Sequence, residues 1–166
     1  DTETLLACFD CWGIKKTIEK CIGMFAIAIW CREDHTLSLV RDRVGEKPLY
    51  YGWQGLGPKA VFLFGSELKA ITEHPYFSAE IDSFALSSFL KNMAVSGNSC
   101  IYKGLNKVPP GTILTVNLEK RLPEINKYWS FNDVLRSSHE ISISPKEAVD
   151  ELEKRLKDSV AKQMLS

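Results

Sequence analysis

The segment at residues 24–30 constrains the fold of this chain more than any other feature of its sequence. Its side chains alternate between two faces, as they do along a strand, and both faces are apolar. One face carries Phe25, Ile27 and Ile29, and the other carries Met24, Ala26, Ala28 and Trp30. A strand of this kind is typical of a sheet that is covered on both sides. We therefore expect a layered domain with this strand in its interior.

Other segments predict further strands and the helices that would cover them. Strands are expected at residues 36–41, 48–51, 61–64, 112–118 and 127–129. The first three would follow residues 24–30 in an antiparallel meander, and residues 112–118 would form an edge strand. Helices are expected at residues 1–12, 15–21, 67–72 and 82–93, with Gly13 ending the first and a loop at residues 94–110. The fold class that follows is α+β.

A second unit is predicted near the C-terminus. Residues 131–143 have no clear hydrophobic period and are expected to be a linker. Ser144, Pro145 and Glu147 then form the signature of a helix start with a capping box. The helix at residues 144–166 would carry an apolar stripe made of Val149, Leu152, Leu156, Val160 and Met164. We interpret it as the first helix of a following domain.

Both ends of the chain are expected to be interrupted. Asp1 is not an initiator methionine and stands directly at a helix start. The last helix reaches Ser166 without a C-cap glycine or a proline. We therefore expect further sequence on both sides.

The composition excludes several classes of partner. Lysine and arginine together number 21, as do aspartate and glutamate, so no net field favours nucleic acid or an anionic membrane. No apolar run approaches the roughly 20 residues that span a bilayer. The five cysteines are odd in number and lie among apolar residues, which predicts a reduced, cytoplasmic protein. A small neutral substrate or a protein partner fits this balance better.

The residues alone reveal no complete catalytic constellation. Cys8 and Cys11 have the C-x-x-C spacing, but no second ligand pair follows, so a packing role is expected. His35, His74 and His139 fall in predicted turns or loops and are expected at the surface. No phosphate-binding or dinucleotide-binding motif is present.

A dense run of charge at residues 41–47 allows two interpretations. In the first, it is a solvated turn in which Gly45 has a positive φ angle. In the second, Asp42 and Arg43 lie beside a cleft or a domain interface and pair with groups from outside this sequence.

Three motifs in register resemble the class II glutamine amidotransferase domain of asparagine synthetases. They are Gly-Met-Phe-Ala-Ile-Ala-Ile-Trp30, Arg-Asp-Arg-Val-Gly-Glu-Lys-Pro-Leu-Tyr-Tyr51 and Phe-Gly-Ser-Glu-Leu-Lys-Ala70. Ile-Tyr-Lys-Gly-Leu-Asn-Lys-Val-Pro-Pro-Gly111 and the pair Tyr128-Trp129 also resemble the asparagine synthetase branch. The resemblance divides the chain into residues 1–130 (the C-terminal part of the amidotransferase domain), 131–143 (a linker) and 144–166 (the start of a synthetase domain).

The resemblance implies an N-terminal nucleophile fold, in which two sheets face each other between helix layers (αββα), here incomplete. In the family, a cysteine at the N-terminus attacks the glutamine amide, and an Asn-Gly pair forms the oxyanion hole. Those residues would precede Asp1, so no catalytic residue is assigned in this chain, and the segment alone would be inactive. The family's Asp-x-Glu element is similar to Asp1-Thr-Glu3, which implies that Asp1 binds the α-ammonium of L-glutamine. The alternative is that Asp1 only caps its helix.

The resemblance also implies a parent enzyme of asparagine biosynthesis, asparagine synthase (glutamine-hydrolysing). Its synthetase domain would bind ATP and Mg²⁺, convert aspartate to an aspartyl adenylate and receive ammonia from glutamine. This chain would bind no metal or cofactor itself. Its partners would be L-glutamine and its own synthetase domain, with a homodimer left open. The alternatives are a β-lactam synthetase-like amidotransferase that has lost glutaminase activity, and a non-catalytic remnant that acts as an interaction module.

Overall fold

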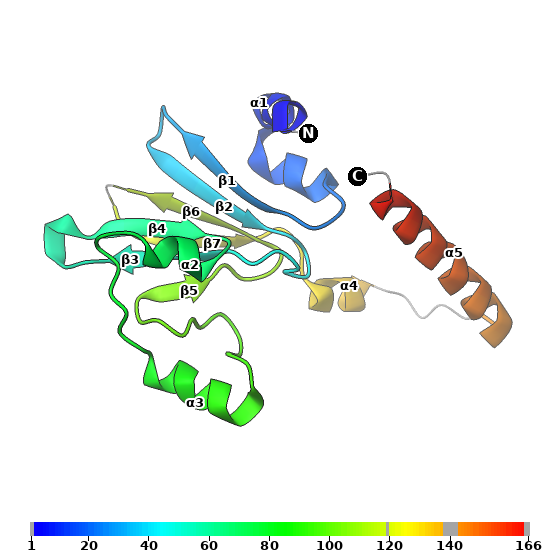
Figure 1. Ribbon diagram of the computed structural model, residues 1–166. Coiled ribbons are helices and arrows are strands. Elements are labelled where there is room, and N and C mark those ends of the chain that lie inside the picture. The colour runs from blue at the N-terminus through cyan, green and yellow to red at the C-terminus, as the bar shows by residue number, and fades with distance from the viewer. Residues whose placement is uncertain (1, 119, 138–142, 165–166) are drawn as a thin grey trace. The chain divides into compact units, whose positions relative to one another are not determined.

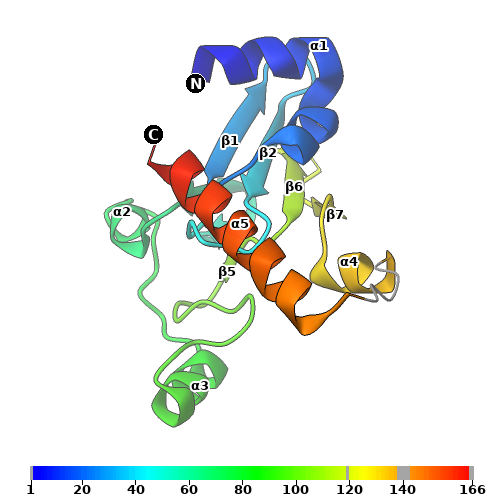
Figure 2. The ribbon, with the colours of Figure 1, turned by 90° about the vertical axis from the view of Figure 1, so that its right-hand side faces the viewer.

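The computed structural model describes residues 2–118, 120–137 and 143–164 (Figures 1 and 2). The chain divides into two compact units, one that ends at Trp129 and one that begins at Ser130. Both helices and strands contribute to the first unit, which agrees with the predicted α+β class.

The first unit contains two antiparallel sheets. Sheet A has the strand order β1-β2-β6-β7 and sheet B has the order β4-β3-β5. The strands of sheet A are β1 (Ala26–Cys31), β2 (Thr36–Arg41), β6 (Thr112–Asn117) and β7 (Pro123–Lys127). The strands of sheet B are β3 (Tyr50–Gln54), β4 (Val61–Gly65) and β5 (Leu105–Lys107), with the 3-10 helix η1 (Gly57–Lys59) between β3 and β4.

The predicted four-stranded meander is wrong. β1 pairs with β2, and β3 pairs with β4, but β2 pairs on its other side with β6. Between β2 and β3 the chain therefore leaves one sheet and enters the other. β6 lies between β2 and β7, so it is a central strand and not the edge strand expected from its alternation. The short strand expected at 127–129 instead ends at Lys127 as β7.

The two sheets pack face to face around a shared core. Its buried residues are Leu37, Leu39, Leu114 and Val116 of sheet A together with Leu49 and Val108. Tyr51, Trp53 and Phe62 of sheet B pack against these residues. Aromatic contacts within sheet B add to the layer, since the rings of Trp53 and Phe62 lie 5.2 Å apart.

A helix covers the outer face of each sheet. Helix α1 (Thr2–Lys20) packs against sheet A through Ile18, which contacts a cluster that includes Val40 and Ile113. Helix α2 (Leu68–Thr72) packs against sheet B through the buried Ile71. The order of layers is therefore helix, sheet, sheet, helix, with α1 and α2 near different sheets in Figure 1.

Helix α1 consists of two helical segments joined at Gly13. Gly13 has φ 75° and ψ 164°, a conformation that favours glycine. The hydroxyl of Thr17 donates to the carbonyl of Cys8 (2.9 Å) and so ties the second segment back to the first. The predicted helix stop at Gly13 is confirmed.

Strand β1 is less buried than its sequence predicts. Ile27 and Ile29 pack in the cluster beneath α1, and Ala26 packs against the core between the sheets. Ala28 is exposed, however, and Trp30 retains 46% of its accessible surface. The reason is that β1 lies at the edge of sheet A, so the second sheet covers only its beginning.

The connections between β4 and β6 contain another helix. Helix α3 (Ser83–Asn92) begins at Asp82, whose side chain accepts from the backbone N–H of Ala85 (2.7 Å). Residues 94–110, expected as a loop, contain the short strand β5.

The second unit contains helices α4 (Phe131–Ser137) and α5 (Pro145–Gln163). Helix α4 lies within the stretch expected as a linker. The capping box at Ser144 and Glu147 is present, and so are the ion pairs of Glu151 with Arg155 and of Glu153 with Lys157. The apolar stripe of α5 is exposed from Val149 to Met164.

Candidate functional site

The turn that follows β2 is organised around a buried carboxylate. Asp42 is 1% exposed. Its Oδ1 accepts from the backbone N–H of Glu46 (2.9 Å), and its Oδ2 accepts from those of Lys47 (2.9 Å) and Phe25 (3.3 Å). Three amide donors satisfy the charge without a cationic side chain. Asp42 is therefore buried and has its partners within the turn and at Phe25, which neither interpretation expected. Val44, Glu46 and Lys47 are exposed, as the first interpretation expects of a solvated turn.

Arg41 closes the same turn from the opposite side. Its guanidinium donates to the carbonyl oxygens of Lys47 (2.9 Å), Val108 (2.8 Å) and Gly45 (2.7 Å). The fork of donors thus joins the turn to the segment that precedes β6. Gly45 has φ 73°, as predicted, and a Cβ there would lie 2.8 Å from Cγ of Pro110.

Arg43 has an incompletely satisfied guanidinium. Its Nη2 donates to the carbonyl of Glu19 near the end of α1 (3.0 Å). Its Nε is buried and has no hydrogen-bond partner among the described residues. Arg43 therefore links the turn to α1 and keeps one donor unused.

Tyr128 completes this cluster from the end of sheet A. Its hydroxyl donates to the carbonyl of Arg41 (2.9 Å). Burial raises the pKa of Tyr128 to about 12, and the nearby carboxylate of Asp42 adds to the shift. The phenol therefore stays protonated and acts as a donor. These hydrogen bonds link the turn to α1 and to the segments that enter the two sheets. We call the cluster the brace; its residues are Arg41, Asp42, Arg43 and Tyr128.

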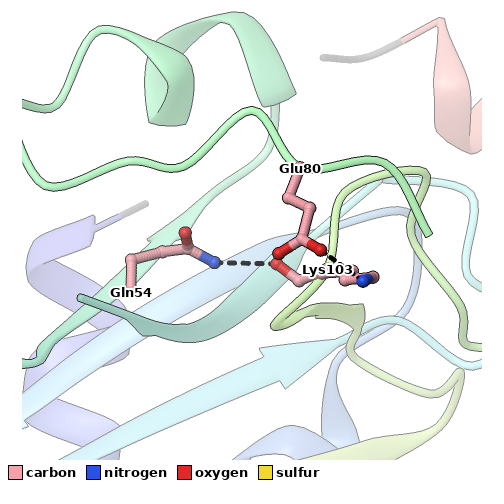
Figure 3. Close-up of polar contacts among 3 residues, drawn as sticks. All are labelled: Gln54, Glu80 and Lys103. Carbon is pink, nitrogen blue, oxygen red and sulfur yellow. Dashed lines mark hydrogen bonds and ion pairs between the residues drawn. The ribbon is translucent and has the colours of Figure 1, made fainter. Parts of the chain in front are cut away.

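A second polar cluster joins β3 to the segment before β5 (Figure 3). Gln54 is 4% exposed; its Nε2 donates to the carbonyl of Lys103 (3.0 Å), and its Oε1 accepts from the N–H of Ser78 (3.1 Å). The Nζ of Lys103 pairs with Glu80 at the surface, and this hydrogen bond raises the pKa of Lys103. Sequence reasoning missed this cluster, because residues 54, 78 and 103 are brought together only by the tertiary fold.

An apolar cavity of about 470 Å³ lies beside α3. Its lining residues are Tyr50, Leu68, Leu86, Phe89, Ala94, Val95, Cys100, Ile101 and Lys107. Burial raises the pKa of the Cys100 thiol, which disfavours its reactive thiolate form. The Nζ of Lys107 donates to the carbonyl of Val95 (2.7 Å). The volume falls within the range of small-molecule and anchor-residue pockets.

The cysteines and histidines singled out in the sequence lie in separate places. All five cysteines are free, with Cys8 partly buried and Cys11 exposed. His35 stacks on Trp30, and the ring of His74 accepts from the N–H of Tyr76 (3.3 Å). His139 falls outside the described residues. Among the residues that the structure describes, no group of three or more cysteine, histidine or acidic side chains could hold a metal ion.

Asp1, the candidate ligand of the glutamine α-ammonium, also falls outside the described residues. Helix α1 begins at the next residue, Thr2, and Glu3 lies in its first turn. In the part of the chain that is described, no helix has both the length and the apolar character needed to cross a membrane.

Comparisons with known proteins bear on this scaffold. A family described as the glutamine amidotransferase domain matches residues 1–129. Asparagine synthetase (glutamine-hydrolysing) 3 of Bacillus subtilis is 32% identical over 167 residues, which cover 100% of this chain and 25% of that protein.

Two further relatives cover the chain almost completely. Asparagine synthetase (glutamine-hydrolysing) 2 of the same organism is 30% identical over 96% of this chain and 22% of its own length. A putative asparagine synthetase (glutamine-hydrolysing) 2 of Methanocaldococcus jannaschii is 29% identical over 100% of this chain and 31% of its own length. The chain thus spans between about a fifth and a third of the length of these curated relatives.

Proposed function

Since this chain belongs to the glutamine amidotransferase domain family, we propose that it is part of a glutamine-dependent asparagine synthetase. The parent enzyme would hydrolyse glutamine and use the ammonia for ATP-dependent amidation of aspartate. The observation that carries the proposal is the family match over residues 1–129, which covers the compact unit that contains the two packed sheets.

The layering supports a specific architecture within this family. An N-terminal nucleophile fold has two facing sheets between two helix layers. The core shared by β2, β6, β3 and β4 and the helices outside it are consistent with that αββα arrangement.

Two sheet edges support the proposal that the domain is incomplete here. Strands β1 and β4 lie at edges of their sheets and carry neither charged residues nor proline. The opposite edge of sheet A, β7, carries Pro123, Glu124 and Lys127. Natural edges are usually guarded by such residues. We propose that further strands of the same protein pair with β1 and β4 and supply the cysteine nucleophile and the oxyanion hole.

We also propose the domain division that the resemblance to the family implies. Residues 1–130 would be the C-terminal part of the glutaminase domain, 131–143 a linker and 144–166 the start of the synthetase domain. The synthetase domain would hold ATP and Mg²⁺. The five free cysteines support a reducing, cytoplasmic location.

Asp1 is the proposed substrate-binding residue of this chain. Its carboxylate would accept a charge-assisted hydrogen bond from the α-ammonium of glutamine. Asp1→Asn keeps the size and removes the charge, so the KM for glutamine should rise by roughly tenfold to a hundredfold. The variant is made in the full-length protein, and glutamate release from glutamine is measured.

The matched control is Asp10→Asn, because Asp10 is an exposed acid on the same helix. Amidation with ammonium salts in place of glutamine should be unchanged in both variants. A KM for glutamine that is the same in Asp1→Asn as in wild type would leave Asp1 as a helix cap only.

A further inference from the structure

The first segment of α1, residues 2–12, is held only lightly by packing. All of these residues are described, and none of them is buried; the partly buried ones are Leu5, Cys8 and Phe9. Phe9 packs against the cluster beneath α1. A buried side chain therefore does not fix the direction in which this segment runs.

The second segment of α1, in contrast, is fixed firmly on sheet A. Thr17 and Ile18 are 2% and 0% exposed, and Ile18 belongs to the buried core of the cluster beneath α1. The carbonyl of Glu19 also accepts from the guanidinium of Arg43 (3.0 Å). The second segment thus provides a stable base to which the first can be attached.

Gly13, at the joint between the two segments, offers little restraint of its own. Its φ of 75° and ψ of 164° interrupt the helix, and Figure 2 shows the two segments running in different directions. A Cβ built at Gly13 would meet nothing within 4 Å, so packing does not confine the joint. Because glycine adopts many backbone conformations, the angle between the segments depends on contacts that span the joint.

The hydroxyl of Thr17 makes such a contact. Its Oγ1 lies 2.9 Å from the carbonyl oxygen of Gly13 and 2.9 Å from that of Cys8, so both acceptors are within reach of its hydrogen. The bond to Gly13, four residues back, is the local bond that threonine often makes inside a helix. The bond to Cys8 crosses the joint. Since Thr17 is buried, water does not readily replace the hydroxyl as a donor.

We propose that Thr17 is a positioning residue for glutamine, which acts through the first segment of α1 on Asp1. This inference rests on the proposed function and on the role proposed there for Asp1, which directly precedes the segment. Residues 2–12 span about 16 Å along a helix axis, so a turn of about 10° at Gly13 would move their start by about 3 Å. A displacement of about 1 Å can already cost a positioned group a hundredfold.

Thr17→Val in the full-length protein tests this role, because valine keeps the shape of threonine and removes the hydroxyl. The KM for glutamine should rise roughly tenfold with kcat changed by less than about twofold, as expected when ground-state binding is weakened. Thr17→Ser keeps the hydroxyl and should restore the KM to within about twofold of wild type. Amidation with ammonium salts should be unchanged in both variants.

The matched control is Thr112→Val. Thr112 is 1% exposed, and its hydroxyl donates to the carbonyl of Pro109 (2.6 Å), in the segment before β6. The control therefore removes a buried hydroxyl that is not bonded to α1, and its KM for glutamine should equal that of wild type. Hydrogen exchange of the amides of residues 2–12 should be faster in Thr17→Val than in Thr112→Val. Equal exchange in the two variants would overturn the proposal.

A double variant shows whether Thr17 acts through Asp1. The KM of Thr17→Val combined with Asp1→Asn should match that of Asp1→Asn alone, because the positioned carboxylate is already lost. Rises in KM that multiply would overturn the proposal, since Thr17 would then act on the fold as a whole.

The same measurements separate this inference from the proposed function. A wild-type protein that hydrolyses glutamine, with the same KM in Thr17→Val, would overturn the positioning role and leave the proposed function intact. A wild-type protein that does not hydrolyse glutamine would contradict the proposed function, and the positioning role with it.

Discussion

At the scale of single residues, the brace around Asp42 accounts for the charged run at 41–47. The side chains of Arg41 and Asp42 form hydrogen bonds with backbone groups of the turn and of the segment before β6. Such hydrogen bonds are costly to break, because each leaves a buried group without a partner. These residues therefore hold the turn against the start of β1 and the segment before β6.

Tyr128 gives this brace a measurable pH dependence. Its pKa rises from 10.0 in its ordinary state to about 12 in the fold. The protonated phenol of Tyr128 therefore contributes its full stabilisation of the fold below about pH 10, and this contribution is lost as the pH rises toward about 12. Tyr128→Phe should cost about 1 kcal/mol at neutral pH, through the lost bond to the Arg41 carbonyl, and should flatten the decline of stability above about pH 10.

Urea unfolding at a series of pH values measures both effects. Tyr76→Phe is the control, because Tyr76 is 52% exposed. A decline above about pH 10 that is equally steep in wild type and Tyr128→Phe would show that the phenol is not responsible.

Residue-level features were predictable where their cause is local. Gly45 and Gly13 were identified correctly, because a turn and a helix end demand positive φ angles nearby in sequence. The partners of Asp42 and Gln54 were not predictable, since the donors to Asp42 include Phe25 and the partners of Gln54 include Lys103.

At the scale of elements, sheet B depends on a close approach between two glycines. A Cβ at Gly52 of β3 would lie 1.9 Å from the carbonyl oxygen of Gly104. The bond from Gln54 to the Lys103 carbonyl holds the same two segments together. The pairing of β3 with β5 therefore requires glycine at 52.

Gly52→Ala should destabilise the protein by at least about 3 kcal/mol, because backbone must move to admit the methyl group. The control is Gly65→Ala, in which the nearest atom would be Cγ1 of Ile71 at 3.4 Å. That variant should stay within about 1 kcal/mol of wild type. Urea unfolding followed by tryptophan fluorescence compares the two, and equal stabilities would contradict the close approach.

Elements with a strong local signal were predicted with the right type. Helix α5 follows from its capping box, and the hairpin of β1 and β2 follows from two apolar runs separated by a polar turn. The pairing of β2 with β6 joins Thr36 to Asn117, and no local pattern encodes a contact across that separation. The meander was therefore the wrong choice among pairings that the strands alone could not distinguish.

At the scale of the whole molecule, the two packed sheets would form part of a glutaminase domain. The edges of β1 and β4 are the places where further strands of the protein would pair. Three motifs in register predicted the family, and the family match over residues 1–129 confirms it. Asp1, the proposed substrate-binding residue, lies outside the described residues.

The most direct test is to measure glutamate release from glutamine by the purified full-length protein and by residues 1–166 alone. We expect hydrolysis by the full-length protein and none by residues 1–166, since the nucleophile is proposed to lie on strands that pair with β1 and β4. A full-length protein that leaves glutamine intact while it amidates an acceptor with free ammonia would contradict the glutaminase assignment. Hydrolysis by residues 1–166 alone would contradict the proposed location of the nucleophile.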